Sequence, residues 1–259
     1  MKKTAIALFF LFAAPLFIAA PLAASYEEAL KLYQEGKHKE SLVLLARELD
    51  VSKDLDDGAP NYRIRFLAAH NHWKLGNNDS AIIHFRRCMD MKNNPIDPYV
   101  DLSLFFLEKN RLNEAETCAR NGLQKERNAM LYYVLGEAAR RRGNFERAKE
   151  FLETANSIDP ENFVSYNALG MTLIHLGRYG DANTAFSVAL AINAASAEVM
   201  NNIGVSLERL AASQEASGNQ KGAAENYKNA FGYYRKANEL DMENKTILEN
   251  LNRLKNKIN

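Results

Sequence analysis

The five histidines, His38, His70, His72, His84 and His175, are the side chains of this chain most able to carry acid–base or metal chemistry. His70 and His72 are two residues apart, which points them to different sides of a helix, so they cannot chelate one ion together. The sequence contains no H-E-x-x-H, paired-cysteine, phosphate-loop or G-x-S-x-G motif. Each histidine is therefore interpreted as an ordinary surface or groove residue. We expect no enzyme activity, no cofactor and no metal site.

Two further groups invite a chemical interpretation. The run Asp56-Asp57-Gly58 hints at calcium, but it lacks the spaced oxygen ligands and the distal glutamate of a calcium loop. Cys88 and Cys118 invite a disulfide if the chain is exported. The alternative is two buried free thiols that fill small positions, and we favour it because the offset of the two cysteines leaves the bridging geometry undetermined.

The elements that must position these side chains follow from an internal repeat between Asn128 and Ala194. Small and apolar residues recur there at an offset of 34 residues, as in Gly136 and Gly170. Both copies carry an aromatic three residues before Leu-Gly, as Tyr132-x-x-Leu135-Gly136 and Tyr166-x-x-Leu169-Gly170, and Pro160 closes the first copy. A 34-residue period with these features is typical of the tetratricopeptide repeat, and the chain resembles that family.

The resemblance implies an all-α, right-handed α-solenoid of about six helix pairs, followed by a C-terminal capping helix. A single helix pair cannot bury its apolar stripe alone, so each pair must stack on the next and the solenoid forms one continuous domain over 26–259. The repeats are expected at 26–50, 61–94, 96–128, 129–162, 163–196 and 197–242, with the cap at 244–258.

The sixth repeat is predicted to be longer than the others. Gly204 and Ala230 are 26 residues apart, whereas the equivalent Gly170 and Ala182 are 12 apart. Fourteen extra residues, seven on each helix, lengthen both helices by about two turns and keep their facing stripes aligned. We therefore expect a long hairpin with helices at 197–216 and 220–240.

The N-terminus, residues 1–25, is predicted to be a signal peptide. Met1-Lys2-Lys3 is followed by an uncharged, apolar run and by Ala23-Ala24-Ser25, which suits cleavage before Tyr26. The alternative is an uncleaved N-terminal tether, although Pro15 and Pro21 interrupt a membrane span of about 20 residues. Export to the bacterial periplasm is predicted, with no stable membrane insertion after cleavage.

The net charge of the chain limits the classes of partner to be expected. Without Lys2 and Lys3 the chain has 31 basic and 32 acidic residues, a net charge of −1. This balance gives no reason to expect nucleic acid or an anionic membrane surface as the partner. A protein partner is expected instead.

In the family, residues that face a ligand come mainly from the first helix of each pair. The resemblance thus implies a groove that binds a peptide or helix of another protein. Two purely structural interpretations stay open. Phe66 and Trp73 can pack between repeats as part of the core. The arginines at 140–142 can interact favourably with the negative end of the helix dipole. Carried over position by position, the groove residues are Phe66, His70, Trp73, Lys74, Tyr133, Glu137, Arg140, Arg141, Asn167, Met171, His175 and Asn201.

The predicted function is a non-catalytic scaffold or adaptor of the bacterial cell envelope. The long hairpin offers a second surface, formed by Tyr227, Phe231 and Tyr234, which could also make a homodimer contact. One alternative is an accessory protein that binds a small anionic ligand for a transporter. Another alternative is a self-assembling structural module held together by the hairpin aromatics.

Overall fold

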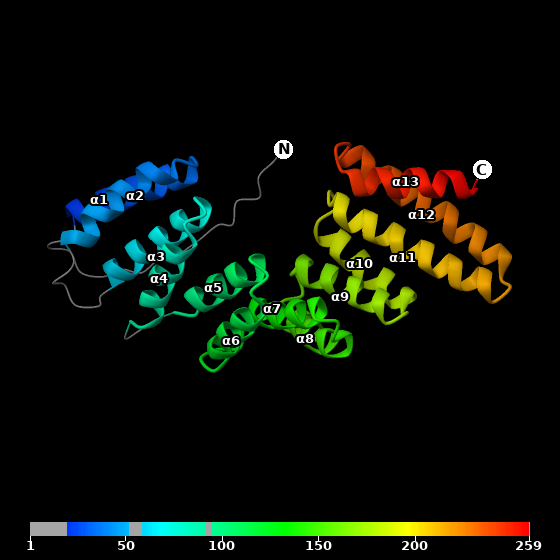
Figure 1. The fold of residues 1–259 in the computed structure, drawn as a ribbon, viewed down its shortest axis with the longest axis horizontal. Coiled ribbons are helices and arrows are strands. Elements are labelled where there is room, and N and C mark those ends of the chain that lie inside the picture. Colours follow the sequence, from blue (N-terminus) through cyan, green and yellow to red (C-terminus); the bar gives the residue numbers. More distant parts are fainter. Residues whose placement is uncertain (1–19, 52–58, 92–94, 259) are drawn as a thin grey trace. The chain divides into compact units, whose positions relative to one another are not determined.

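The structure is a computed structural model that describes residues 20–51, 59–91 and 95–258. All regular secondary structure in these residues is α-helical, which confirms the predicted all-α class (Figure 1). Residues 1–19 of the predicted signal peptide and the run Asp56-Asp57-Gly58 lie outside the described residues. The helices are α1 (Ala20–Gln34), α2 (His38–Val51), α3 (Ala59–Lys74), α4 (Asn78–Met89), α5 (Asp97–Glu108), α6 (Leu112–Leu123), α7 (Ala129–Arg141), α8 (Phe145–Ile158), α9 (Phe163–His175), α10 (Tyr179–Ile192), α11 (Ala197–Ala216), α12 (Gln220–Leu240) and α13 (Lys245–Ile258).

The chain divides into two compact units, the first ending at Pro98 and the second beginning at Tyr99. Unit 1 contains α1 to α4, and unit 2 contains all but the first two residues of α5 and continues to α13. Within each unit, helices are joined in pairs by short turns and packed in chain order (Figure 1). Each unit is described by itself below, and the single continuous domain over 26–259 stays a prediction.

The turn inside each helix pair requires one residue in the left-handed region. Gly143, between α7 and α8, has φ of 80°, which glycine adopts without steric cost. The turn between α5 and α6 uses Asn110 instead, at φ 56°. Asparagine is one of the few other residues that tolerates this conformation, so the third pair keeps the same tight turn without a glycine.

Close approach of the two helices in a pair depends on a glycine in the first helix. A Cβ placed on Gly170 of α9 would lie 2.4 Å from Cε1 of Phe186 in α10. A Cβ on Gly204 of α11 would lie 2.5 Å from Cε1 of Tyr234 in α12. Gly170 and Phe186 are 16 residues apart in sequence, whereas Gly204 and Tyr234 are 30 apart. The difference equals the fourteen residues inserted in the last hairpin.

The lengthened last hairpin is therefore confirmed. Helices α11 and α12 have 20 and 21 residues, and they begin and end at the predicted positions. Seven residues on each helix are about two turns, so the insertion lengthens the hairpin and leaves the glycine-to-ring contact intact.

Helix α13 closes the end of unit 2 as the predicted cap. Its Ile247 and Leu254 are buried, and Leu254 belongs to an apolar cluster with Ala211, Tyr227 and Tyr234 of the long hairpin. The rest of α13 is mostly asparagine, lysine and glutamate. A helix with one apolar and one polar face seals the end of a stack of repeats.

Both cysteines are buried, as the free-thiol interpretation expects. Cys88 of α4 lies in unit 1, with its Sγ 3.8 Å from the carbonyl oxygen of Tyr62. Cys118 of α6 lies in unit 2, with its Sγ 3.5 Å from the carbonyl oxygen of Tyr99. Burial raises the pKa of the Cys88 thiol to about 12, so this thiol is unreactive at neutral pH.

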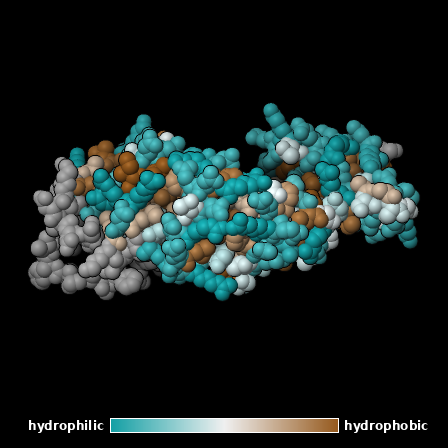
Figure 2. Space-filling model, turned by 60° about the horizontal axis from the view of Figure 1, so that its bottom comes forward, coloured by the Kyte–Doolittle hydropathy of each residue, from teal (hydrophilic) through white to brown (hydrophobic). Residues whose placement is uncertain are grey.

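Among the described helices, none combines the length and the apolar character that a membrane span needs. The face of the molecule in Figure 2 is mostly hydrophilic, with apolar residues in small separate groups.

Candidate partner-binding surface

In unit 1, helix α3 gathers an aromatic group around Phe85 of α4. Phe66 and His70 meet edge to face with ring centroids 4.7 Å apart, and His70 stacks on Trp73 at 6.0 Å. All three rings lie within 6.3 Å of Phe85, which is fully buried. The three α3 rings are half-buried, so they anchor the pair from one side and reach solvent on the other, while Lys74 is exposed.

In unit 2, Glu137 of α7 is a buried carboxylate held by two arginines. Arg140 donates from Nε and Nη2 to the two carboxylate oxygens, each at 2.7 Å, and Arg141 donates from Nε to Oε1 at 2.7 Å. Arg141 also donates from Nη1 to the carbonyl oxygen of Leu107 at the end of α5. Glu137 is 4% exposed. Although burial acts to raise its pKa, the hydrogen bonds from both guanidiniums hold the pKa of Glu137 below its usual value.

This arrangement changes the interpretation of the predicted arginine groove. Arg140 and Arg141 form ion pairs and hydrogen bonds with the buried carboxylate of Glu137. Through its bond to Leu107, Arg141 also links α7 to α5 within the unit. Removing either partner of a buried ion pair leaves an unpaired charge, which is costly. Their first role is structural, and a ligand would meet a largely neutralised group.

A row of side-chain amides connects the first helices of unit 2. Asn167 of α9 donates to Glu198 of α11 at 2.9 Å and accepts from Asn202 at 3.0 Å. Asn201 of α11 accepts from Asn250 of α13 at 3.0 Å. The predicted groove residues Asn167 and Asn201 therefore belong to two separate sets of hydrogen bonds, one between α9 and α11 and the other between α11 and the cap. Asn202 and Asn250 were not predicted, because their partners are 35 and 49 residues away in sequence.

Half-buried apolar side chains accompany these amides. Tyr133 of α7, with Met171 and Ile174 of α9, packs on the apolar core around Leu173 and Phe186. Burial raises the pKa of Tyr133 to about 12, helped by the carboxylate of Glu137. We use the name first-helix face of unit 2 for half-buried Tyr133 and Met171 together with the amides of Asn167 and Asn201, which are buried at 6% and 9% exposure.

His175 departs from this face. Its ring stacks on Phe145 at the start of α8, with centroids 4.3 Å apart and planes 3° apart. Phe145 belongs to the second helix of the preceding pair, so the predicted groove residue His175 packs against a turn. It is exposed.

The predicted hairpin surface needs correction. Tyr227 and Tyr234 are 6% and 0% exposed because the cap helix α13 covers them. The Tyr227 hydroxyl donates to Glu215, and the Tyr234 hydroxyl donates to Glu208, which also accepts from Arg253 of α13. Phe231 is half-buried against the same cluster. The two tyrosines therefore belong to the core and offer no docking surface.

The remaining histidines form no metal centre. Within the described ranges there is no group of three or more histidine, cysteine, aspartate or glutamate side chains that could hold an ion. His72 and His84 stack with ring centroids 5.4 Å apart. Burial lowers the pKa of His84 to about 4, and the nearby His72, Arg65 and Arg87 act in the same direction. The His84 ring is thus neutral at pH 7, and burial also lowers the pKa of His72 below its usual value.

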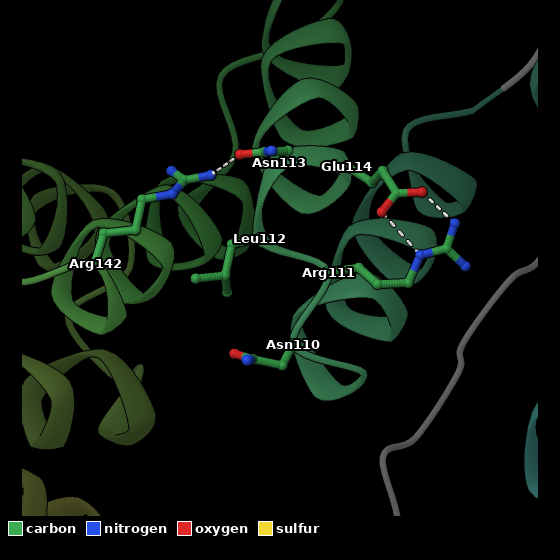
Figure 3. A pocket seen from close by; sticks show the side chains of 6 residues that line it. All are labelled: Asn110, Arg111, Leu112, Asn113, Glu114 and Arg142. Carbon is green, nitrogen blue, oxygen red and sulfur yellow. Dashed lines mark hydrogen bonds and ion pairs between the residues drawn. The ribbon is translucent and has the colours of Figure 1, made fainter.

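A shallow hollow of about 320 Å³ lies at the turn between α5 and α6 (Figure 3). Residues 110–114 and Arg142 line it, and none of these is a predicted groove residue. Arg142 donates from Nη2 to Asn113 at 2.7 Å and from Nη1 to Glu116 at 2.6 Å. The three consecutive arginines 140–142 therefore serve two separate places, with Arg142 turned toward α6.

Sequence comparison agrees with the observed helix pairs. The tetratricopeptide repeat family matches residues 62–95 in unit 1 and residues 129–162 and 151–182 in unit 2. Residues 62–95 and 129–182 thus match tetratricopeptide repeats. Repeats of this kind are typical of protein–protein interaction scaffolds and are typically non-enzymatic.

A curated relative supports the same assignment. Human tetratricopeptide repeat protein 7B is 28% identical over 144 residues, which are 52% of this chain and 16% of that protein. The chain thus matches less than a fifth of the length of this relative.

Solved structures show the fold alone, because sequence identities are low. PilW, described as a type IV pilus biogenesis factor, has a TM-score of 0.68 at 15% identity, covering 91% of this chain and 98% of its own. Cut9 bound to Hcn1 has a TM-score of 0.70 at 13% identity, covering 90% of this chain and 42% of its own. YrrB, described as a tetratricopeptide repeat protein with an unusual peptide-binding site, has a TM-score of 0.54 at 16% identity, covering 79% and 96%.

Proposed function

We propose that the chain is a non-catalytic scaffold that binds a peptide or helix of another protein on the first-helix face of unit 2. The observation that carries the proposal is the composition of this face. Half-buried Tyr133 of α7 and Met171 of α9 offer apolar contact area, and the buried amides of Asn167 and Asn201 are ordered by hydrogen bonds to neighbouring helices. Apolar contact area on a preorganised scaffold favours binding because little conformational freedom is lost.

The half-buried rings of Phe66, His70 and Trp73 are proposed as a second binding region in unit 1. Aromatic side chains that are anchored in a core and open on one side are frequent hot spots, since they lose little conformational freedom on binding. Exposed Lys74 adds a charge at the edge of this region.

Two alternative functions, binding of a small anionic ligand and self-assembly through the hairpin, are less well supported by the observed contacts. A small anionic ligand was expected in a groove with Arg140, Asn167, His175 and Asn201. The guanidinium of Arg140, which would supply its positive charge, is engaged by Glu137. Self-assembly through the hairpin was expected to use Tyr227 and Tyr234, which are covered by α13. Protein binding on the first-helix face depends on neither.

An envelope location is part of the proposal and depends on residues 1–25 being a signal peptide. It is supported by the basic start, the apolar run and the small residues before Tyr26. Its test is the intact mass of the full chain, purified from a Gram-negative host after osmotic shock. A mass that lacks residues 1–25, found in the shock fluid, is expected. An unshortened chain in the membrane fraction would instead favour the tether.

Binding on the first-helix face is tested by site-specific photo-crosslinking in the native envelope fraction. A photoreactive phenylalanine analogue replaces Met171 on the proposed face, or Trp73 for the region in unit 1. The matched control places the same analogue at Ser187, an exposed residue of the second helix α10. A protein captured from Met171 and absent from the Ser187 control is expected. Equal capture from both positions, or capture from Ser187 alone, would contradict the proposed face.

A further inference from the structure

Away from the first-helix face, three arginines surround one carboxylate on the second helices of unit 2. Arg120 of α6 donates from Nε and Nη2 to Oε1 of Glu116, at 3.1 and 2.7 Å. Arg142 donates to Oε2 at 2.6 Å, and Arg147 of α8 lies 3.9 Å from Oε1. We call Glu116, Arg120, Arg142 and Arg147 the arginine cluster.

The arginine cluster has more positive charge than its carboxylate can balance. Three guanidiniums and one carboxylate leave a charge of +2. In the part of the chain that the structure describes, no second carboxylate lies within ion-pairing distance of these guanidiniums. Elsewhere in unit 2, exposed Arg178 and Arg235 each have one carboxylate partner, Asp181 and Glu239.

The excess charge is accessible to solvent. The side chains of Arg120 and Arg147 are 43% and 54% exposed. Arg147 makes no hydrogen bond to any described residue, since its contacts are the long ion pair with Glu116 and the ring of Phe151. Its five N–H donors are therefore open to an acceptor from outside the chain.

Phe151 of α8 sets the spacing of the two exposed arginines. The Cζ atoms of Arg120 and Arg147 lie 5.9 and 5.4 Å from its ring centroid. Because both Cζ atoms lie within 6 Å of the Phe151 ring centroid, the two guanidiniums are at most about 12 Å apart. This distance is the length of three to four residues of an extended chain. Arginine is well suited to such a site because its planar fork binds a carboxylate through two parallel hydrogen bonds.

We propose that the arginine cluster is a second binding surface, which takes an acidic, extended segment of a partner protein with two carboxylates up to three residues apart. Arg120 and Arg147 bind the carboxylates, the half-buried ring of Phe151 packs against the intervening residues, and Glu116 keeps the guanidiniums in place. Nucleic acid is disfavoured, since its binding uses many phosphate contacts and the chain as a whole is nearly neutral.

The cluster differs in position from the first-helix face. Glu116, Arg120, Arg147 and Phe151 lie on the second helices α6 and α8, and Arg142 lies in the turn after α7. Arg142 also lines the hollow in Figure 3, which leaves room beside the cluster for the end of a bound segment. A partner bound here leaves the first-helix face free.

The test measures binding of a fluorescein-labelled peptide of alternating glutamate and serine by fluorescence anisotropy at low salt. The double variant Arg120→Gln with Arg147→Gln is compared with Arg178→Gln with Arg235→Gln, which removes the same charge from exposed ion pairs elsewhere in unit 2. Circular dichroism verifies that both variants stay folded. We expect wild-type protein and the control to bind alike, and the cluster variant to bind at least tenfold more weakly with a shallower salt dependence.

Binding by the cluster variant within twofold of wild type would overturn the proposal, as would a wild-type protein that does not bind the peptide. A peptide of alternating lysine and serine should show no binding. Phosphatidylglycerol vesicles provide the last comparison: if they bind in an arginine-dependent way and the acidic peptide does not, the surface recognises lipid and the proposal is wrong.

Discussion

Replacing Gly170 by alanine should destabilise unit 2, although alanine is the better helix former. The new Cβ would lie 2.4 to 2.6 Å from three ring atoms of Phe186, about 1 Å closer than ordinary carbon contacts. Phe186 is fully buried, so its ring cannot swing into solvent. Overpacking of this kind costs about 1 to 3 kcal/mol, and the gain in helix propensity offsets about 1 kcal/mol. Because three atoms overlap, we expect a net loss of about 1 to 2 kcal/mol.

The assay is thermal and urea unfolding followed by circular dichroism. Gly232→Ala is the matched control, because Gly232 is also inside a helix and nothing lies within 4 Å of its added Cβ. The control should gain up to about 1 kcal/mol. For a chain of this length, the loss in Gly170→Ala should lower the unfolding temperature by roughly 3 to 6 °C.

A double-mutant cycle tests the cause. In a Phe186→Ala background the ring is gone, so Gly170→Ala should cost nothing or become stabilising. If Gly170→Ala stabilises the wild-type chain as much as the control does, or if its cost persists without the ring, the close-approach argument fails.

Three further predictions concern buried groups. Glu137→Gln should lower the free energy of unfolding, measured in urea, by about 2 to 3 kcal/mol, because Arg140 and Arg141 lose their carboxylate partner. Since folding lowers the pKa of Glu137, this stabilisation is fully present above about pH 4.3 and is lost as the pH falls through the folded pKa. His84 has a folded pKa of about 4, so the folded state binds fewer protons than the unfolded state at mildly acidic pH. After allowance for partial exposure, the free energy of unfolding should fall by about 1 to 2 kcal/mol from pH 8 to pH 5. His84→Leu should flatten this pH dependence, and an unchanged slope in the variant would contradict the assignment to His84. Leu254→Ala should cost about 2 to 4 kcal/mol and speed amide hydrogen exchange in α12 and α13 first, whereas uniform exchange would show that the cap does not act locally.

Much of the fold could be predicted from local pattern. The offset of 34 residues indicated repeated helix pairs, and the spacing from Gly204 to Ala230 predicted a hairpin with helices of 20 and 21 residues. These features depend on helical periodicity and on small residues at fixed positions, which are properties of neighbouring residues in the chain. The bounds of the last hairpin therefore needed no knowledge of long-range contacts.

The candidate site could be predicted only in part. The position rule selected Asn167 and Asn201 from the correct helices, but it could not reveal that Glu198 and Asn250 bind them. It also treated Arg140 to Arg142 as one charged group, whereas Glu137 and Glu116 divide them between two places. A list of charges along a helix does not say which carboxylate each guanidinium meets.

By itself, the sequence determined that the chain builds helix pairs and that the last pair is long, with helices at 197–216 and 220–240, because apolar periodicity, turn residues and glycine spacing act over a few helical turns. Only the tertiary structure decided which side chains are available to a partner. Tyr227 and Tyr234 looked like a surface until α13 covered them. Arg147 kept open donors because Glu116 was already bonded to Arg120 and to Arg142, and stacking brings Arg142 to Glu116 from 26 positions away in sequence. Exposure and pairing depend on such distant neighbours, and those neighbours are fixed when the repeats pack.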